Sequence, residues 1–76
     1  MRKQDFQDHS RFRFVNQVRD PARIERGGGV PTYKLHEEVA TGHVYQLYEL
    51  GNCWRKGVQK HAMDVPSYGE WQPFEP

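Results

Sequence analysis

The middle of the chain alternates apolar and polar side chains, as strands with one face toward a core do. In TYKLHEEV, residues 32–39, the apolar side chains Tyr33, Leu35 and Val39 occupy alternate positions. HVYQLYEL follows after ATG, and CWRKGV begins beyond LGN. The breaks between these runs hold Gly and Asn, which suit tight turns. The pattern predicts an antiparallel β-meander over residues 32–60.

The two turns decide which residues of this meander face each other. A two-residue turn at Thr41-Gly42 would pair Val39 with Val44, and one at Gly51-Asn52 would pair Leu50 with Cys53. The resulting register predicts one face composed of Tyr33, Leu35, Val39, Val44, Tyr48, Leu50 and Cys53. The opposite face is then composed of Tyr45, Leu47, Trp54 and Val58 among His36, His43 and Lys56. Both faces carry apolar groups, so the second face needs a cover or is a contact surface.

The segments before the meander are harder to assign. SRFRFVNQV, residues 10–18, fits a strand with Phe12, Phe14, Asn16 and Val18 on one side, and also fits a helix capped by Ser10. Its Phe- and Val-rich composition favours the strand. DPARIER, residues 20–26, is typical of a single helical turn, because Asp and Pro suit a helix start. RGGGVP, residues 26–31, is expected to be a flexible loop, and residues 1–10 are polar and expected to be flexible.

The C-terminal segment, residues 61–76, loses the alternation and is rich in proline. An extended, irregular course is therefore expected. Its rings, Tyr68, Trp71 and Phe74, recur every three residues, a spacing that polyproline-like backbone would align along one edge. We expect them to pack back on the face that holds Tyr45, Leu47, Trp54 and Val58. The alternative is a tail that docks on a partner.

Composition agrees with a β-rich fold. The 76 residues fit one domain, with ten aromatic residues but only four Leu and Ile together. Aromatic and β-branched side chains pack well on pleated surfaces, and a net charge of +1 does not keep the chain expanded. The sequence predicts a small mostly-β (or α+β) single domain over residues 1–76, an antiparallel three- to four-stranded meander with an irregular C-terminal segment.

The same composition bears on location. The chain has no apolar run long enough to cross a bilayer and no signal segment with a charged and then an apolar region. Its one cysteine, Cys53, cannot form an internal disulfide, so nothing indicates an oxidising compartment. These features predict a soluble cytoplasmic protein.

Chemistry-bearing side chains form no recognisable set. A cysteine nucleophile needs a base nearby, yet the expected meander places His36 and His43 on the face opposite Cys53, and His61 lies beyond its third strand. His36 and His43 would also lie roughly 13 Å apart along the strands, too far to share one zinc ion. The sequence therefore predicts no enzyme, no catalytic residues, no metal and no cofactor.

Two binding functions are left. The N-terminal region interleaves cations with aromatic rings in RFRF, which suits phosphates and stacked bases. Nucleic-acid binding would use Arg11, Arg13, Arg19, Arg23 and Arg26. A net charge of +1 is low for such a domain, so this function is the alternative.

Docking on another protein fits the residue types better, because interface centres are rich in Tyr, Trp, Phe, Met and Arg. The candidate contact residues are Tyr45, Trp54, Tyr68, Trp71 and Phe74. Small proteins of this kind commonly act by occupying a surface on a larger one. A phage- or plasmid-type accessory protein that inhibits a host factor would have these properties, although the sequence names no partner.

Overall fold

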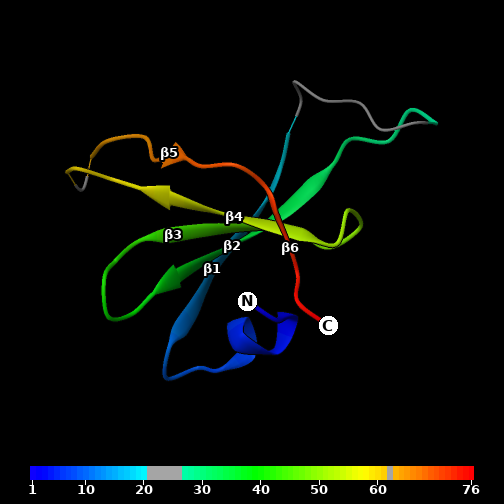
Figure 1. Cartoon of the computed structure of the whole chain (residues 1–76). Helices are drawn as coiled ribbons and strands as arrows, with labels where there is room; N and C mark the ends of the chain where they lie inside the picture. Colours follow the sequence, from blue (N-terminus) through cyan, green and yellow to red (C-terminus); the bar gives the residue numbers. More distant parts are fainter. Residues whose placement is uncertain (21–26, 62) are drawn as a thin grey trace.

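The computed structural model describes residues 1–20, 27–61 and 63–76, which form one antiparallel sheet with a short helix beside it (Figure 1). The 3-10 helix η1 spans Lys3–Gln7. The strands are β1 (Phe12–Arg19), β2 (Thr32–Glu38), β3 (Val44–Tyr48), β4 (Cys53–Val58), β5 (Ser67–Tyr68) and β6 (Gln72–Pro73). The predicted small mostly-β fold with an antiparallel meander is confirmed.

Neighbours in the sequence are neighbours in the sheet, in the order β1-β2-β3-β4-β5. The short strands β5 and β6 both pair with β4, one near its end and one near its start. The C-terminal segment therefore runs beside β4 as an interrupted edge strand (Figure 1). In the described part of the chain, the opposite edge of the sheet is β1.

The register of the meander differs from the predicted one by two residues at both turns. Glu37 pairs with Val44 and Tyr48 with Cys53, so each loop has four residues, 39–42 and 49–52. In each loop the last residue has a positive φ, 75° at Gly42 and 54° at Asn52. Gly and Asn adopt this conformation most readily, and here they close a longer turn than the predicted two-residue one.

A shift of two residues keeps the side chains of the strands on their predicted faces. Val39 and Leu50 no longer belong to the strands. They lie in the loops, 59% and 82% exposed. We call the side with Tyr45, Leu47 and Trp54 the core face, and the side with Tyr33, Tyr48 and Arg55 the tyrosine face.

Residues 12–19 form a strand, but its side chains do not stay on one side as predicted. The register with β2 shifts between Phe14 and Asn16, where Val15 is an extra residue. A bulge of this kind reverses the faces of the residues beyond it. Phe12 and Phe14 consequently lie on the core face, whereas Asn16 and Val18 lie on the tyrosine face.

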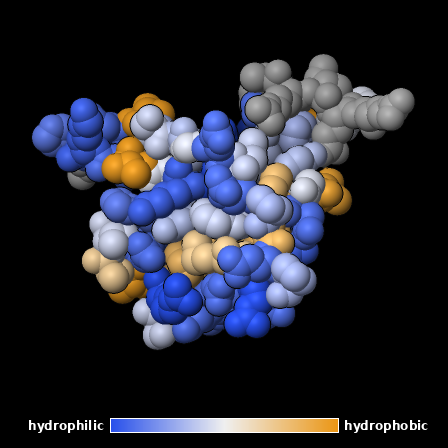
Figure 2. Space-filling model, viewed as in Figure 1, coloured by the Kyte–Doolittle hydropathy of each residue, from blue (hydrophilic) through white to orange (hydrophobic). Residues whose placement is uncertain are grey.

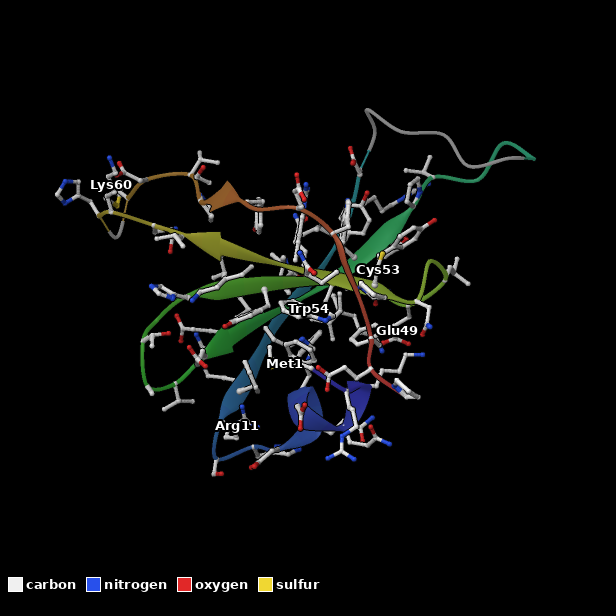
Figure 3. All side chains as sticks on the ribbon, viewed as in Figure 1. Met1, Arg11, Glu49, Cys53, Trp54 and Lys60 are labelled. Atoms are coloured by element: carbon white, nitrogen blue, oxygen red, sulfur yellow. The ribbon has the colours of Figure 1, made fainter. Side chains whose placement is uncertain are left out.

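The core consists of aromatic rings gathered around Phe6. The side chain of Phe6 is 3% exposed, and the buried cluster comprises Phe6, Phe12, Tyr45, Leu47 and Phe74, with Met1 and Trp54 packed against it. Figure 3 shows Met1 and Trp54 close together on the side of η1. The sequence predicts a flexible segment over residues 1–10. In the structure these residues hold η1, which covers the core face.

The C-terminal rings pack on both faces of the sheet, whereas the sequence predicts all three on one. Phe74 lies on the core face, with its ring centroid 6.1 Å from that of Phe6. Trp71 lies on the tyrosine face, 5.4 Å from Tyr33. Strand pairing replaces the polyproline course, and Trp71 and Phe74, three residues apart, therefore point to opposite sides. The register with β4 shifts by one residue between β5 and β6, which keeps Tyr68 on the same face as Trp71.

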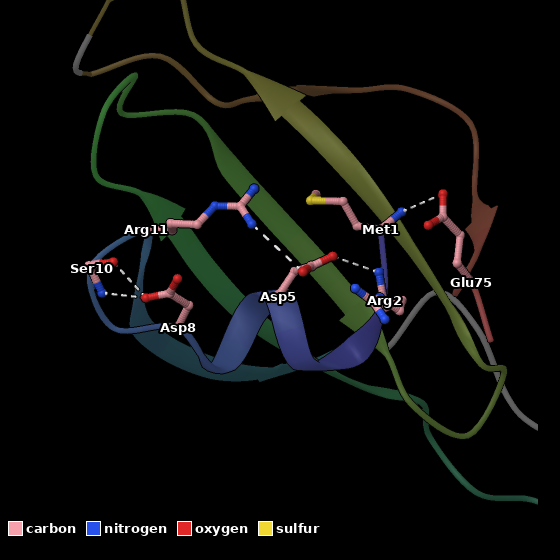
Figure 4. A network of polar contacts seen from close by, with 7 residues as sticks. All are labelled: Met1, Arg2, Asp5, Asp8, Ser10, Arg11 and Glu75. Atoms are coloured by element: carbon pink, nitrogen blue, oxygen red, sulfur yellow. Dashed lines mark hydrogen bonds and ion pairs between the residues drawn. The ribbon is translucent and has the colours of Figure 1, made fainter.

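The two ends of the described chain meet beside η1 (Figure 4). The Glu75 N–H donates to the Met1 carbonyl at 3.0 Å, and the Met1 amine lies 3.5 Å from the Glu75 carboxylate. Asp5 holds the start of η1 by accepting from the Arg2 N–H at 2.8 Å. These contacts fix the segments that cover the core face.

Two further expectations concern the segment between β1 and β2. The helical turn predicted over residues 20–26 falls outside the described residues, apart from Asp20. Of the predicted loop at 26–31, Gly27 and Gly28 have φ of 103° and 90°, which glycine adopts without strain. Within the described ranges, no helix is long and apolar enough to cross a membrane.

Candidate functional site

The tyrosine face carries an arginine held between two aromatic rings. The guanidinium carbon of Arg55 lies 4.5 Å from the ring centroid of Trp71 and 4.8 Å from that of Tyr68. Its Nε donates to Gln46 Oε1 at 2.6 Å. Cation–π contacts and a hydrogen bond together fix the orientation of the side chain. We call Arg55, Tyr68 and Trp71 the arginine cluster.

Strand pairing between β4 and the C-terminal segment assembles this cluster. Tyr68 stands opposite Gly57 in the β4–β5 pair, and its ring lies over that glycine. A Cβ on residue 57 would be 2.6 Å from the ring, so a larger residue does not fit. On the other side of Arg55, Trp71 packs against Tyr33 and Tyr48, at 5.4 and 6.1 Å between ring centroids.

The cluster is partly open to solvent, since Arg55, Tyr68 and Trp71 are all half-buried. Burial raises the pKa of the Tyr68 hydroxyl, and the nearby Arg55 charge opposes this shift. Tyr68 therefore keeps its proton at neutral pH and can donate a hydrogen bond. The site presents a cation, a phenol and an indole in fixed positions.

A second feature is a groove beside the beginning of β1. It has a volume of about 510 Å³ and is lined by Phe6, Gln7, His9, Phe12, Arg13, Phe14, His36 and Val39. Phe14 is 55% exposed although it belongs to a strand. The lining therefore combines apolar rings with cationic or titratable groups and includes no carboxylate.

His36 lies between two rings at this groove, with centroids 5.9 Å from Phe6 and 5.5 Å from Phe14. Burial, and after it the positive charge of Lys34, lowers the pKa of the imidazole below its usual 6.5. Its Nδ1 is buried and has no hydrogen-bond partner among the described residues. Neutral histidine is thus the form that the fold favours.

Protonation of His36 should therefore destabilise the protein. The folded state takes up this proton at lower pH than the unfolded chain does. The contribution of His36 to stability is therefore complete above pH 6.5, and it is lost as the pH falls through the lowered pKa. We expect the melting temperature to fall on acidification below pH 6.5, and to fall less in His36→Gln. Thermal melts of both proteins across this range measure the difference. Equal slopes would contradict the assignment.

The five predicted contact residues do not form one surface. Tyr45 and Phe74 are buried in the core, 4% and 8% exposed, and Trp54 packs against them. Only Tyr68 and Trp71 belong to the arginine cluster. Sequence reasoning missed Arg55, because its place between these rings depends on the pairing of β4 with a segment that was expected to be irregular. As partner contacts, all five residues stay a prediction.

The arginines proposed for nucleic-acid binding are placed differently from one another. Arg11 Nη1 lies 3.7 Å from the Asp5 carboxylate, and Arg13 Nη2 lies 3.1 Å from that of Glu37. Arg19 ends β1 and is exposed. Arg23 and Arg26 lie outside the described residues. Two of the five therefore already have acidic partners within the protein, which reduces the charge they offer to phosphates.

The chemistry-bearing residues are distributed as the sequence indicates. Cys53 pairs with Tyr48 on the tyrosine face, whereas His36 lies on the core face. Across residues 1–20, 27–61 and 63–76, no group of three or more His, Cys, Asp or Glu side chains is placed to hold a metal ion.

On the side shown in Figure 2, hydrophilic residues predominate and the hydrophobic ones form separate patches. Comparison with known proteins adds no family, because no family model, curated protein or solved structure matches the chain. The functional proposal therefore depends on the arrangement of side chains.

Proposed function

We propose that this protein is a binding module that docks on a larger protein through the arginine cluster on its tyrosine face. The observation that carries the proposal is the position of Arg55, stacked between Tyr68 and Trp71 on a half-buried sheet face. Trp, Tyr and Arg are the residues in which the binding energy of protein interfaces is concentrated. The cluster brings one of each together.

Rigidity is a second argument for docking. Binding normally costs free energy because long side chains lose rotamer freedom, about 0.5–1.5 kcal/mol for each one that is immobilised. Here Gln46 and two rings already hold Arg55 in the free protein. Much of the ordering of this side chain is therefore complete before a partner arrives.

The proposal includes no catalytic step, and it favours a protein over a nucleic acid as the partner. Arg11 and Arg13 of the alternative site are engaged in ion pairs, and the net charge is +1. Inhibition of a host factor by a phage- or plasmid-type accessory protein would be one consequence of docking. Identification of the captured protein, followed by an assay of its activity, tests that finer proposal.

Adjacent residues of β4 provide a matched test. Arg55 and Lys56 carry the same charge but lie on opposite faces. Immobilised protein should capture a partner from the source cell, and Arg55→Ala should reduce its recovery at least tenfold, as expected for a contact worth about 2 kcal/mol. Lys56→Ala should stay within twofold of wild type. Quantitative mass spectrometry measures recovery, and thermal melts establish that both variants fold.

Two results would contradict docking through this cluster. One is equal recovery with both variants. The other is loss of the captured material after nuclease treatment, combined with steep weakening as salt rises, which is the behaviour of phosphate contacts. The second result would favour the nucleic-acid alternative, and Arg11→Ala with Arg13→Ala should then abolish binding.

A further inference from the structure

The edge strand β1 has backbone groups that point away from the sheet. Two hydrogen bonds show which groups point inward: the Val39 N–H donates to the Arg11 carbonyl, and the Asp20 N–H donates to the Pro31 carbonyl, both at 2.9 Å. In antiparallel pairs such residues alternate with residues whose N–H and C=O groups face outward. Alternation from Arg11 toward the bulge makes Phe12 and Phe14 outward residues. Alternation from Asp20 toward the bulge makes Arg19 and Gln17 outward residues.

Two other contacts agree with this assignment. The outward N–H of Phe12 donates to the Asp8 carbonyl at 2.9 Å, and that of Gln17 donates to Asn16 Oδ1 at 2.8 Å. Both bonds are local and lie outside the β1–β2 ladder. In the described part of the chain, no strand pairs with this side of β1. Four of the eight residues of β1 therefore face outward, and the N–H groups of two of them, Phe12 and Gln17, already have local partners.

Side chains on and beside this edge indicate what it could bind. β1 contains no acidic residue and ends in the exposed Arg19, whereas Arg11 and Arg13 are already paired with Asp5 and Glu37. The groove beside its first half has an apolar floor with Phe14 and Val39 exposed by 55% and 59%. A strand that carries carboxylates and apolar side chains in alternation matches both features.

We propose that β1 binds an extended acidic segment of the partner protein, which adds to the sheet as a further strand and places an apolar side chain in the groove. Strand addition of this kind obtains affinity from main-chain hydrogen bonds and specificity from pockets for alternate side chains. The inference rests on the proposed docking function and names the chemistry of the partner. A second copy of this chain is disfavoured, since β1 carries arginines and no carboxylate that could pair with them.

Other features of the edge agree with selective binding. Long open edges invite unwanted pairing, and proteins restrict them with charges and bulges. Here the bulge at Val15 opposes a flat strand, and the exposed charge of Arg19 opposes a basic one. An acidic strand is the one that Arg19 attracts, so the charge that opposes a basic strand also selects the partner.

The test uses two labelled ten-residue peptides, one alternating Glu and Val and the other alternating Lys and Val. Fluorescence anisotropy should show that the whole protein binds the acidic peptide at least tenfold more tightly than the basic one. NMR should locate the acidic peptide at β1, with slower amide exchange at Phe14. Equal binding of both peptides, no binding of the acidic one, or shifts confined to the arginine cluster would overturn the proposal.

Variants of the edge sharpen this experiment. Gln17→Pro removes an outward donor and leaves the β1–β2 ladder intact, since proline is tolerated where the N–H of an edge strand faces solvent. It should weaken the acidic peptide about fivefold, the equivalent of one lost hydrogen bond of about 1 kcal/mol. Arg19→Glu should weaken it about fivefold, whereas Lys60→Glu, the same change beyond the end of β4 (Figure 3), should leave it within twofold. Wild-type affinity in a folded Gln17→Pro protein, or in Arg19→Glu, would contradict strand addition.

Capture of the partner from the source cell separates this inference from the docking function. If only the edge inference is wrong, Gln17→Pro keeps the partner and Arg55→Ala loses it. If docking itself is wrong, neither substitution changes recovery. If the edge inference holds, both substitutions reduce it. A dimer in sedimentation experiments that Gln17→Pro dissociates would show that the edge binds a second copy, and would overturn the proposal.

Discussion

Replacement of Phe6 by alanine should unfold much of the protein at ambient temperature. Its ring lies within 6.1 Å, between centroids, of five others: Phe12, His36, Tyr45, Trp54 and Phe74. Loss of a buried phenylalanine costs about 3–5 kcal/mol. A small domain has a total stability of roughly 0.05–0.15 kcal/mol per residue, so the loss is comparable to the whole. We expect a melting temperature lower by roughly 12–40 °C.

Phe14→Ala is the matched control, because the same atoms are removed from a ring that is 55% exposed. Its cost should be below about 1 kcal/mol. Calorimetry or circular dichroism of the two variants beside wild type gives the comparison. Similar melting temperatures for Phe6→Ala and wild type would mean that η1 does not cover the core face in solution.

Deletion of residues 66–76 should have an effect of similar size. The deletion removes Phe74 from the core, removes Trp71 from Tyr33 and Tyr48, and leaves one side of β4 unpaired. Each of these large rings contributes on the order of 2–3 kcal/mol when fully buried. The truncated chain should melt at a temperature lower by many degrees, or show no cooperative transition.

Two point variants divide this effect between the faces. Phe74→Ala tests the core face and Trp71→Ala tests the tyrosine face, and each should lower the melting temperature by several degrees. Val65→Ala, at an 89% exposed position just before the deleted segment, should leave it unchanged. A truncated chain that melts like wild type but no longer captures a partner would show that the rings serve binding alone.

Alternation in the sequence identified the strands of the meander and the face of each side chain, because a period of two is a local property. The register was off by two residues at both turns. Glycine and asparagine suit the last position of a four-residue loop as well as the second position of a two-residue loop. The residue types at positions 42 and 52 therefore do not decide the loop length. Packing of Tyr33 against Tyr48, 5.4 Å between centroids, accompanies the longer loops.

Segments at either end of the chain were less predictable, because tertiary contacts alone order them. Phe6 is one apolar residue in a polar stretch, and no period marks it as a core residue. The bulge at Val15 likewise leaves no signal in the alternation of β1. For the candidate site, Tyr68 and Trp71 stood out by residue type, whereas Arg55 joins them through the β4–β5 and β4–β6 pairing.

The meeting of the two ends has a consequence for biosynthesis. Proteins emerge from the ribosome with their N-terminal part first, so η1 and the meander are outside before Phe74 follows. During that interval the rings of Phe6 and Trp54 lack the neighbour that packs against them in the finished fold. Partly folded chains with exposed apolar surface aggregate readily. A chain that ends between residues 60 and 72 should therefore give less soluble protein on expression than residues 1–76 do.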